Sequence, residues 1–174
     1  MVGRTDYYPH FFTATILQWK PLLQQDKYKD IIIESLRFLA AERRVVVYGF
    51  VIMHNHIHLL WHICEGHKRE DVQRDFLKYT AQRMKADLEK HHPAVLERFK
   101  VAAKDRQYQF WERNPLSIEV WRQPVLEQKL YYIHRNPLGE RWQMAKQPED
   151  YRYSSAGFYH FGRSEWEFLT HYLG

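Results

Sequence analysis

The sequence predicts an α+β fold in which helices pack on an antiparallel sheet, close to the split βαβ, ferredoxin-like plan. Three observations predict it. Short β-prone runs alternate with longer segments of helical spacing, in the order strand, helix, strand, strand, helix, strands, helix. The length of 174 residues suits a single domain, and 45% hydrophobic residues are enough for one core. No internal repeat or linker interrupts the chain, so we expect one domain over residues 1–174.

The first half of the chain supplies three strands and one helix. Residues 11–17 are rich in β-branched and aromatic side chains, which is typical of a strand. Residues 27–42 repeat apolar side chains at helical intervals. A second β-prone run spans 45–52, and residues 53–55 are a candidate tight connection to a third strand. This pattern predicts an antiparallel pair following the first helix.

The second half is predicted to be more irregular. Helical spacing returns over 69–90 and again over 124–135, where Pro stands at a helix start. Between them, 108–111 and 117–121 favour a strand or hairpin pair. The tail after residue 138 alternates aromatic and charged residues and predicts one or two short helices with irregular connections.

Composition narrows the function classes. Lys and Arg exceed Asp and Glu by five, which suits a polyanionic partner without requiring one. The single cysteine, Cys64, excludes an intrachain disulfide framework and a multi-cysteine zinc site. With no leader segment and no apolar run of membrane-spanning length, we expect a cytoplasmic protein without a membrane partner.

The stretch 51–63 carries the main functional signal. Read as a strand, it sends Ile57, Leu59, Trp61 and Ile63 to one face and His54, His56, His58 and His62 to the other. Neutral imidazoles two apart on a strand can hold one metal ion together. Hydrogen-bonded surface histidines, or adventitious metal binding, would give the same pattern. Two ligands make a poor metal site, so a third must come from elsewhere.

The helix predicted over 124–135 could supply it. Gln128, Tyr132 and Asn136 are spaced i, i+4, i+8 and stack on one side of the helix. A phenol oxygen close to a metal could attack phosphorus and form a phosphotyrosine. Tyr132 could equally be a packing residue at the edge of the core, and the helical wheel does not separate it from Tyr131.

Candidate DNA contacts lie elsewhere. The outer side of the helix over 69–90 is basic, and a solvated helix face is the ordinary interpretation of such a charge run. A phosphate-binding face is the functional alternative. On that interpretation, the aromatic N-terminal residues Tyr7 and Tyr8 and the helix cations Lys78, Arg83 and Lys85 would contact DNA.

Two motifs together carry a family resemblance. Residues 49–60, G-F-V-I-M-H-N-H-I-H-L-L, resemble the HUH signature of single-strand-specific tyrosine transposases, where U is a hydrophobic residue. Residues 131–137, Y-Y-I-H-R-N-P, resemble the catalytic-helix signature of the same family, closest to the branch of REP-associated tyrosine transposases. Residues 148–155, P-E-D-Y-R-Y-S-S, resemble a stretch that follows this helix in that branch. The resemblance covers about residues 7–160.

The resemblance implies an HUH-type nuclease fold and a mechanism. His56 and His58 would hold Mg²⁺ or Mn²⁺, Asn136 would be the third ligand, and Tyr132 would be the nucleophile. The substrate would be single-stranded DNA beside hairpins, cut to leave a 5′-phosphotyrosine and a free 3′-OH. Related transposases also pair two chains, so a homodimer is an expectation. One departure is His54, which stands where the family usually has proline.

The rival hypothesis is a non-catalytic, RNA-recognition-like module that binds single-stranded nucleic acid. Residues 48–51, Y-G-F-V, faintly resemble the sheet motif whose aromatics stack on bases. Base stacking needs neither the histidine pair nor the tyrosine helix, so those residues discriminate. A zinc hydrolase is a weaker alternative because no H-E-x-x-H occurs.

Overall fold

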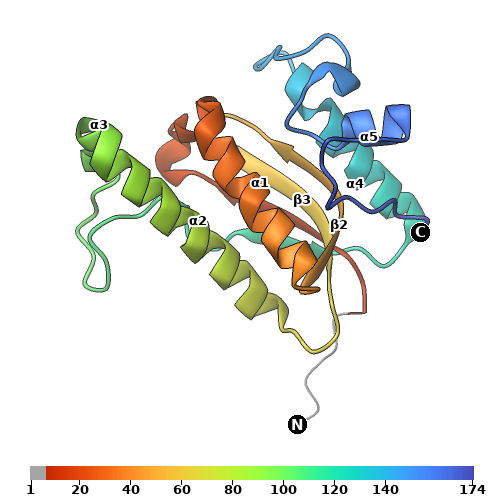
Figure 1. Cartoon of the computed structure of the whole chain (residues 1–174), viewed down its shortest axis with the longest axis horizontal. Coiled ribbons are helices and arrows are strands. Elements are labelled where there is room, and N and C mark those ends of the chain that lie inside the picture. The colour runs from red at the N-terminus through yellow and green to blue at the C-terminus, as the bar shows by residue number, and fades with distance from the viewer. Residues whose placement is uncertain (1–6) are drawn as a thin grey trace.

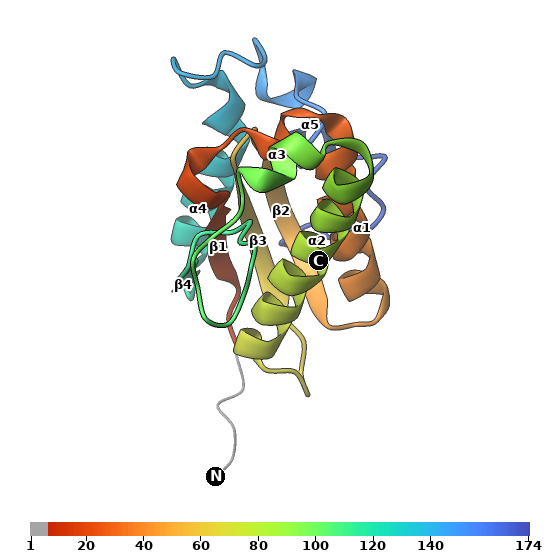
Figure 2. The ribbon, with the colours of Figure 1, turned by 90° about the vertical axis from the view of Figure 1, so that its left-hand side faces the viewer.

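The computed structural model describes residues 7–174. Its centre is a four-stranded sheet in the order β2-β3-β1-β4, and every neighbouring pair is antiparallel (Figure 2). The strands are β1 (His10–Thr15), β2 (Val45–Ile52), β3 (His56–Ile63) and β4 (Leu116–Glu119). The third strand lies between the first and the second, which is the arrangement of a split βαβ fold. The predicted fold class is confirmed.

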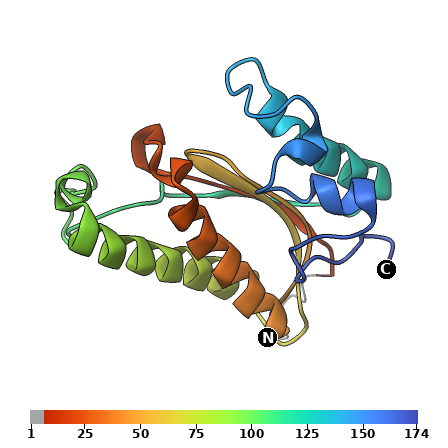
Figure 3. The ribbon, with the colours of Figure 1, turned by 45° about the horizontal axis from the view of Figure 1, so that its top comes forward.

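Helices add a layer to each side of the sheet (Figures 1 and 3). The long helices α1 (Asp26–Ala41) and α2 (Arg69–His91) pack side by side on one face, and the short α3 (Pro93–Glu97) follows α2. On the other face lie α4 (Gln123–Arg135) and α5 (Ala156–Phe161). Within residues 7–174, no helix is long and apolar enough to cross a membrane.

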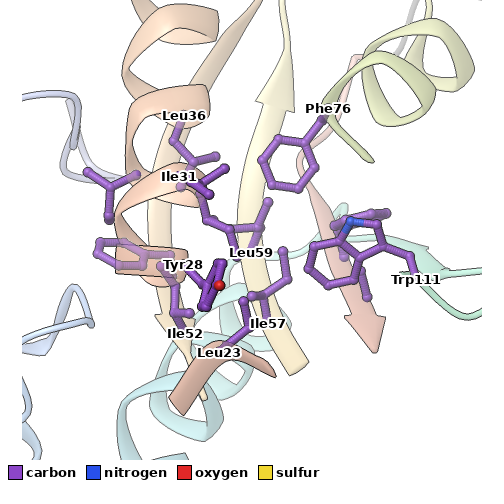
Figure 4. Close-up of a cluster of buried hydrophobic side chains, with 14 of the residues drawn as sticks. Leu23, Tyr28, Ile31, Leu36, Ile52, Ile57, Leu59, Phe76 and Trp111 are labelled. Carbon is purple, nitrogen blue, oxygen red and sulfur yellow. The ribbon is translucent and has the colours of Figure 1, made fainter. Parts of the chain in front are cut away.

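The larger core fills the space between the sheet and the α1–α2 layer (Figure 4). Ile57 and Leu59 of β3 point into it together with Tyr28 of α1 and Phe76 of α2. Trp61 and Ile63 belong to the same cluster. The alternation predicted for this strand is therefore confirmed. One face of β3 is spent on the core, and the other is left for the histidines.

The smaller core joins α4 to the opposite face of the sheet. Leu126, Leu130 and Ile133 of α4 pack on Leu60 of β3 and on neighbouring strand residues. A side chain on Gly49 would put its Cβ 2.5 Å from Leu130 Cδ1, so glycine lets α4 approach β2 closely at the point where the β2–β3 register shifts. This contact sets the height of α4 above the sheet.

Two predicted segments behave differently from the sequence interpretation. Residues 108–111 and 117–121 do not pair with each other: β4 pairs with β1, Tyr108 bridges to Lys100, and Trp111 bridges to Ile16. The cause is the indole of Trp111, which is buried against the α2 side and donates a hydrogen bond to Thr80. The tail forms a 3₁₀ turn (Pro148–Asp150) and α5, as predicted.

Candidate active site

A cavity of about 500 Å³ opens on the α4 side of the sheet, over β1, β3 and β4. Its polar members include both predicted metal-binding histidines, the predicted nucleophile and the predicted amide ligand. No Asp or Glu side chain is among the described residues that line it, whereas two cations are. The lining residues are Phe11, Thr13, Thr15, Trp19, His56, His58, Leu116, Ile118, Lys129, Tyr132, Asn136, Arg141 and Trp142.

His58 is held by the strand next to its own. The β1–β3 register places Thr13 directly opposite His58, and Thr13 Oγ1 lies 2.7 Å from His58 Nδ1. The imidazole also stacks on Phe11, with ring centroids 5.3 Å apart. The second ring nitrogen, Nε2, is buried and has no hydrogen-bond partner among the described residues. The ring is therefore fixed through Nδ1, and its Nε2 remains available to a ligand.

His56 is oriented by the residue before it. The Asn55 amide donates to the backbone carbonyl of Trp19 at 3.2 Å, which leaves Asn55 Oδ1 facing His56 Nδ1 at 2.8 Å. Because an amide oxygen only accepts, His56 Nδ1 must carry the proton. The lone pair of His56 then lies on Nε2, which points at Asn136 Oδ1, 3.2 Å away.

This geometry suits a divalent cation. In the neutral Nδ1–H tautomer, His56 Nε2 and the Asn136 oxygen as oriented are both acceptors, so no proton joins them. Two ligand atoms about 2.1 Å from an octahedral ion, at right angles to each other, lie about 3 Å apart. The unpartnered Nε2 of His58 adds a third donor atom on the same strand face. The residues present therefore fit a site of two imidazoles and one amide oxygen.

Burial keeps both imidazoles in the form that a metal requires. Burial lowers the pKa of His58 to about 3, and the neighbouring His56 and Lys129 add to the effect. Burial also lowers the pKa of His56, and Arg141 contributes in the same direction, while the contact with Asn136 opposes it. Both rings are therefore neutral near pH 7 and can donate a lone pair.

Tyr132 lies over His58, with ring centroids 5.3 Å apart, and it also contacts the edge of Phe11. Its side chain is half exposed, so its hydroxyl can meet a substrate. Asn136, one turn later, follows directly after the last residue of α4. Tyr131 is not part of the cavity and stacks under the guanidinium of Arg135. The structure thus separates the two tyrosines that the helical wheel could not.

Comparisons with known proteins agree with this arrangement. No protein-family model matches the chain, and no curated protein matches it. Among solved structures, a REP-associated tyrosine transposase bound to a REP hairpin aligns with a TM-score of 0.63 at 17% identity, covering 90% of this chain and 84% of that one. The chain has the fold of a tyrosine transposase. A candidate transposase from Deinococcus radiodurans also aligns, with a TM-score of 0.47 at 16% identity, over 75% of this chain and 94% of its own.

In this tyrosine transposase fold, the other strand histidines lie outside the proposed ligand set. The His54 ring meets the edge of Trp142, and burial lowers its pKa. His62 lies at the far end of β3, and neither residue lines the cavity. Across residues 7–174, no three His, Cys, Asp or Glu side chains gather closely enough to hold a metal. A metal site here depends on the amide of Asn136.

The predicted DNA-contact residues are not brought to the cavity. Lys78, Arg83 and Lys85 lie on α2, on the opposite side of the sheet. Arg83 Nη2 lies 3.7 Å from Glu34 and Lys85 Nζ lies 3.9 Å from Glu89, whereas Lys78 is exposed. Tyr7 and Tyr8 are exposed immediately before β1. A DNA role for these residues stays a prediction.

Several cavity residues escaped the sequence interpretation. Asn55 sits between His54 and His56, so its position within the motif could have marked it as an orienting residue. Thr13 could be found only from the β1–β3 register, which the sequence does not reveal. The remaining cavity residues with no earlier assignment are Trp19, Lys129, Arg141 and Trp142.

Proposed function

We propose that the chain is a metal-dependent tyrosine transposase that nicks and rejoins single-stranded DNA near hairpins through a 5′-phosphotyrosine. The observation that carries the proposal is the convergence of His56, His58, Asn136 and Tyr132 in one cavity, although they come from segments about 75 residues apart. The transposase fold supports it. The neighbour's hairpin supports hairpin-bearing DNA as the substrate class.

The chain's own residues bind and orient the scissile phosphate. His56 and His58, with Asn136, would hold Mg²⁺ or Mn²⁺, which when bound would polarise the phosphate oxygens and draw charge off the reacting phosphorus. Lys129 and Arg141 line the same cavity and attract the phosphate backbone. No Asp or Glu among the described lining residues repels it.

Tyr132 performs the covalent step. Its phenol oxygen attacks phosphorus and forms the P–O bond of a 5′-phosphotyrosine while the bond from phosphorus to the 3′ oxygen breaks. The phenol proton passes to solvent at the half-exposed hydroxyl, and the departing 3′ oxygen takes up a proton to become a free 3′-OH. One ester replaces another. Attack by a 3′-OH reverses the step, so rejoining needs no nucleotide energy source.

The alternative binding module loses its platform in the structure. The motif over 48–51 would have to display its aromatics on the sheet surface. Phe50 is instead fully buried against Trp166 and Phe168, and Tyr48 is half-buried. A zinc hydrolase would need a carboxylate base, and the described cavity lining contains none. The histidines and Tyr132 are left without a purpose in either reading.

The decisive experiment is capture of a covalent adduct. Purified protein is incubated with hairpin-bearing single-stranded oligonucleotides and Mn²⁺, and adducts are resolved on a denaturing gel. We expect Tyr132→Phe to form no adduct while binding the oligonucleotide normally, and Tyr131→Phe to react as the parent chain does. Adduct formation by Tyr132→Phe but not by Tyr131→Phe would overturn the assignment of the nucleophile.

The metal role is tested on the same gel. His56→Ala should abolish Mg²⁺- or Mn²⁺-stimulated cleavage, and EDTA should do so in the parent chain. Full activity under either condition would refute the ligand assignment. All four site residues come from one chain, so pairing of two chains is not needed to complete the site. A homodimer and a cytoplasmic location stay predictions, checked by sedimentation and by cell fractionation.

A further inference from the structure

Trp19 stands at the wall of the cavity without a role in the core. It belongs to a single 3₁₀ turn (Leu17–Trp19) between β1 and α1. The indole is 56% exposed, and its ring lies 6.2 Å from that of His56. A tryptophan this exposed gains little from burial, so stability of the fold does not account for its placement.

The backbone holds Trp19 there against its own preference. Gln18 and Trp19 have φ angles of 54° and 58°, in the left-handed region that non-glycine residues rarely occupy. Hydrogen bonds fasten both residues: the Gln18 amide donates to Glu112, and the Trp19 carbonyl accepts from Asn55. Strained backbone that surrounding contacts maintain is a common feature of ligand-binding sites.

Asn55 joins this turn to the proposed metal site. Its oxygen accepts from His56 Nδ1 and its nitrogen donates to Trp19, so one buried amide sets both the ligand and the indole. On the other side of His56 lies Trp142, with ring centroids 5.9 Å apart. An aromatic ring therefore flanks each side of the imidazole that would hold the scissile phosphate.

We propose that Trp19 is the stacking platform for an unpaired nucleobase next to the phosphate held at His56 and His58. The inference rests on the proposed function. The cavity offers cations for the phosphate backbone, no carboxylate among its described lining residues, and a flat exposed indole for the base. Bases stack on aromatic side chains independently of sequence, because every base has a π-face. A base inside a duplex has both faces covered, so the platform selects single strands.

The test separates stacking from charge. We would measure binding of a dT 12-mer and of a 12-mer with the same phosphates but abasic sugars, both in EDTA so that cleavage cannot occur. Trp19→Leu removes the π-face and keeps an apolar side chain, whereas Trp19→Phe keeps a smaller π-face. The matched control is Trp121→Leu, because Trp121 is 66% exposed and lies outside the cavity.

We expect Trp19→Leu to bind dT12 at least about fivefold more weakly, the equivalent of ~1 kcal/mol for one stacked base. Its affinity for the abasic 12-mer should match that of the parent chain. Trp19→Phe should recover part of the loss, and Trp121→Leu should show none. Equal weakening toward both 12-mers, or no weakening toward dT12, would overturn the proposal. Because neither probe is cleaved, failure here leaves the Tyr132 adduct experiment unaffected.

Discussion

Asn55 is the residue whose loss should damage the proposed metal site most without removing a ligand. Its side chain is 3% exposed and makes two hydrogen bonds, one to His56 Nδ1 and one to the Trp19 carbonyl. Asn55→Ala deletes both. It leaves the His56 N–H unsatisfied inside the protein, and it frees the imidazole to move its proton to the nitrogen that should bind metal.

The size of the effect follows from these contacts. A buried donor left without a partner costs about 1–3 kcal/mol, so two orphaned groups should lower the free energy of unfolding by about 2–4 kcal/mol. Loss of a residue that orients a metal-binding histidine typically costs about 10–100-fold in metal affinity. We therefore expect Mn²⁺ affinity to fall within that range while His56, His58 and Asn136 are all still present.

A second variant distinguishes orientation from general damage. In Asn55→Asp the carboxylate still accepts from His56 Nδ1–H, and more strongly, but it cannot donate to Trp19. Mn²⁺ affinity should then equal or exceed that of the parent chain, although stability still falls. Affinity would be followed by the electron paramagnetic resonance signal of free Mn²⁺, and folding by circular dichroism. Equal loss of affinity in both variants, or an Asn55→Ala affinity within twofold of the parent, would refute the reasoning.

Two further predictions concern pH and salt. Burial lowers the pKa of His134 to about 4, so between pH 6.5 and 4 the unfolded chain binds a proton that the folded chain does not, and stability falls with pH. At pH 5 this amounts to about 2 kcal/mol, which His134→Gln should remove from the difference in urea unfolding between pH 7 and pH 5; an unchanged difference would count against it. If α2 contacts the hairpin stem, a triple alanine variant should flatten the plot of log affinity against log salt by about 0.9 per lost contact. An unchanged slope would exclude phosphate contacts by Lys78, Arg83 and Lys85.

The fold and half of the site could be anticipated because they depend on local periodicity. The period of two in β3 sends Ile57 and Leu59 to the core and His56 and His58 to the other face, whatever strands lie beside it. The i, i+4 spacing likewise keeps Tyr132 and Asn136 together on α4. The transposase fold was predicted from the same motifs, and the alignment at a TM-score of 0.63 confirms it.

The rest of the site depends on contacts between distant segments, which periodicity does not encode. Thr13 reaches His58 only because β1 pairs with β3 in one particular register, and Trp19 reaches the cavity only through two backbone angles that most sequences avoid. The α2 cations show the converse: they form a regular basic face, yet the sheet separates it from the cavity. Periodicity therefore identifies which side of an element carries polar groups. Packing determines whether that side meets the chemistry, and here Gly49, by letting α4 approach β2, is what lets Tyr132 reach His58.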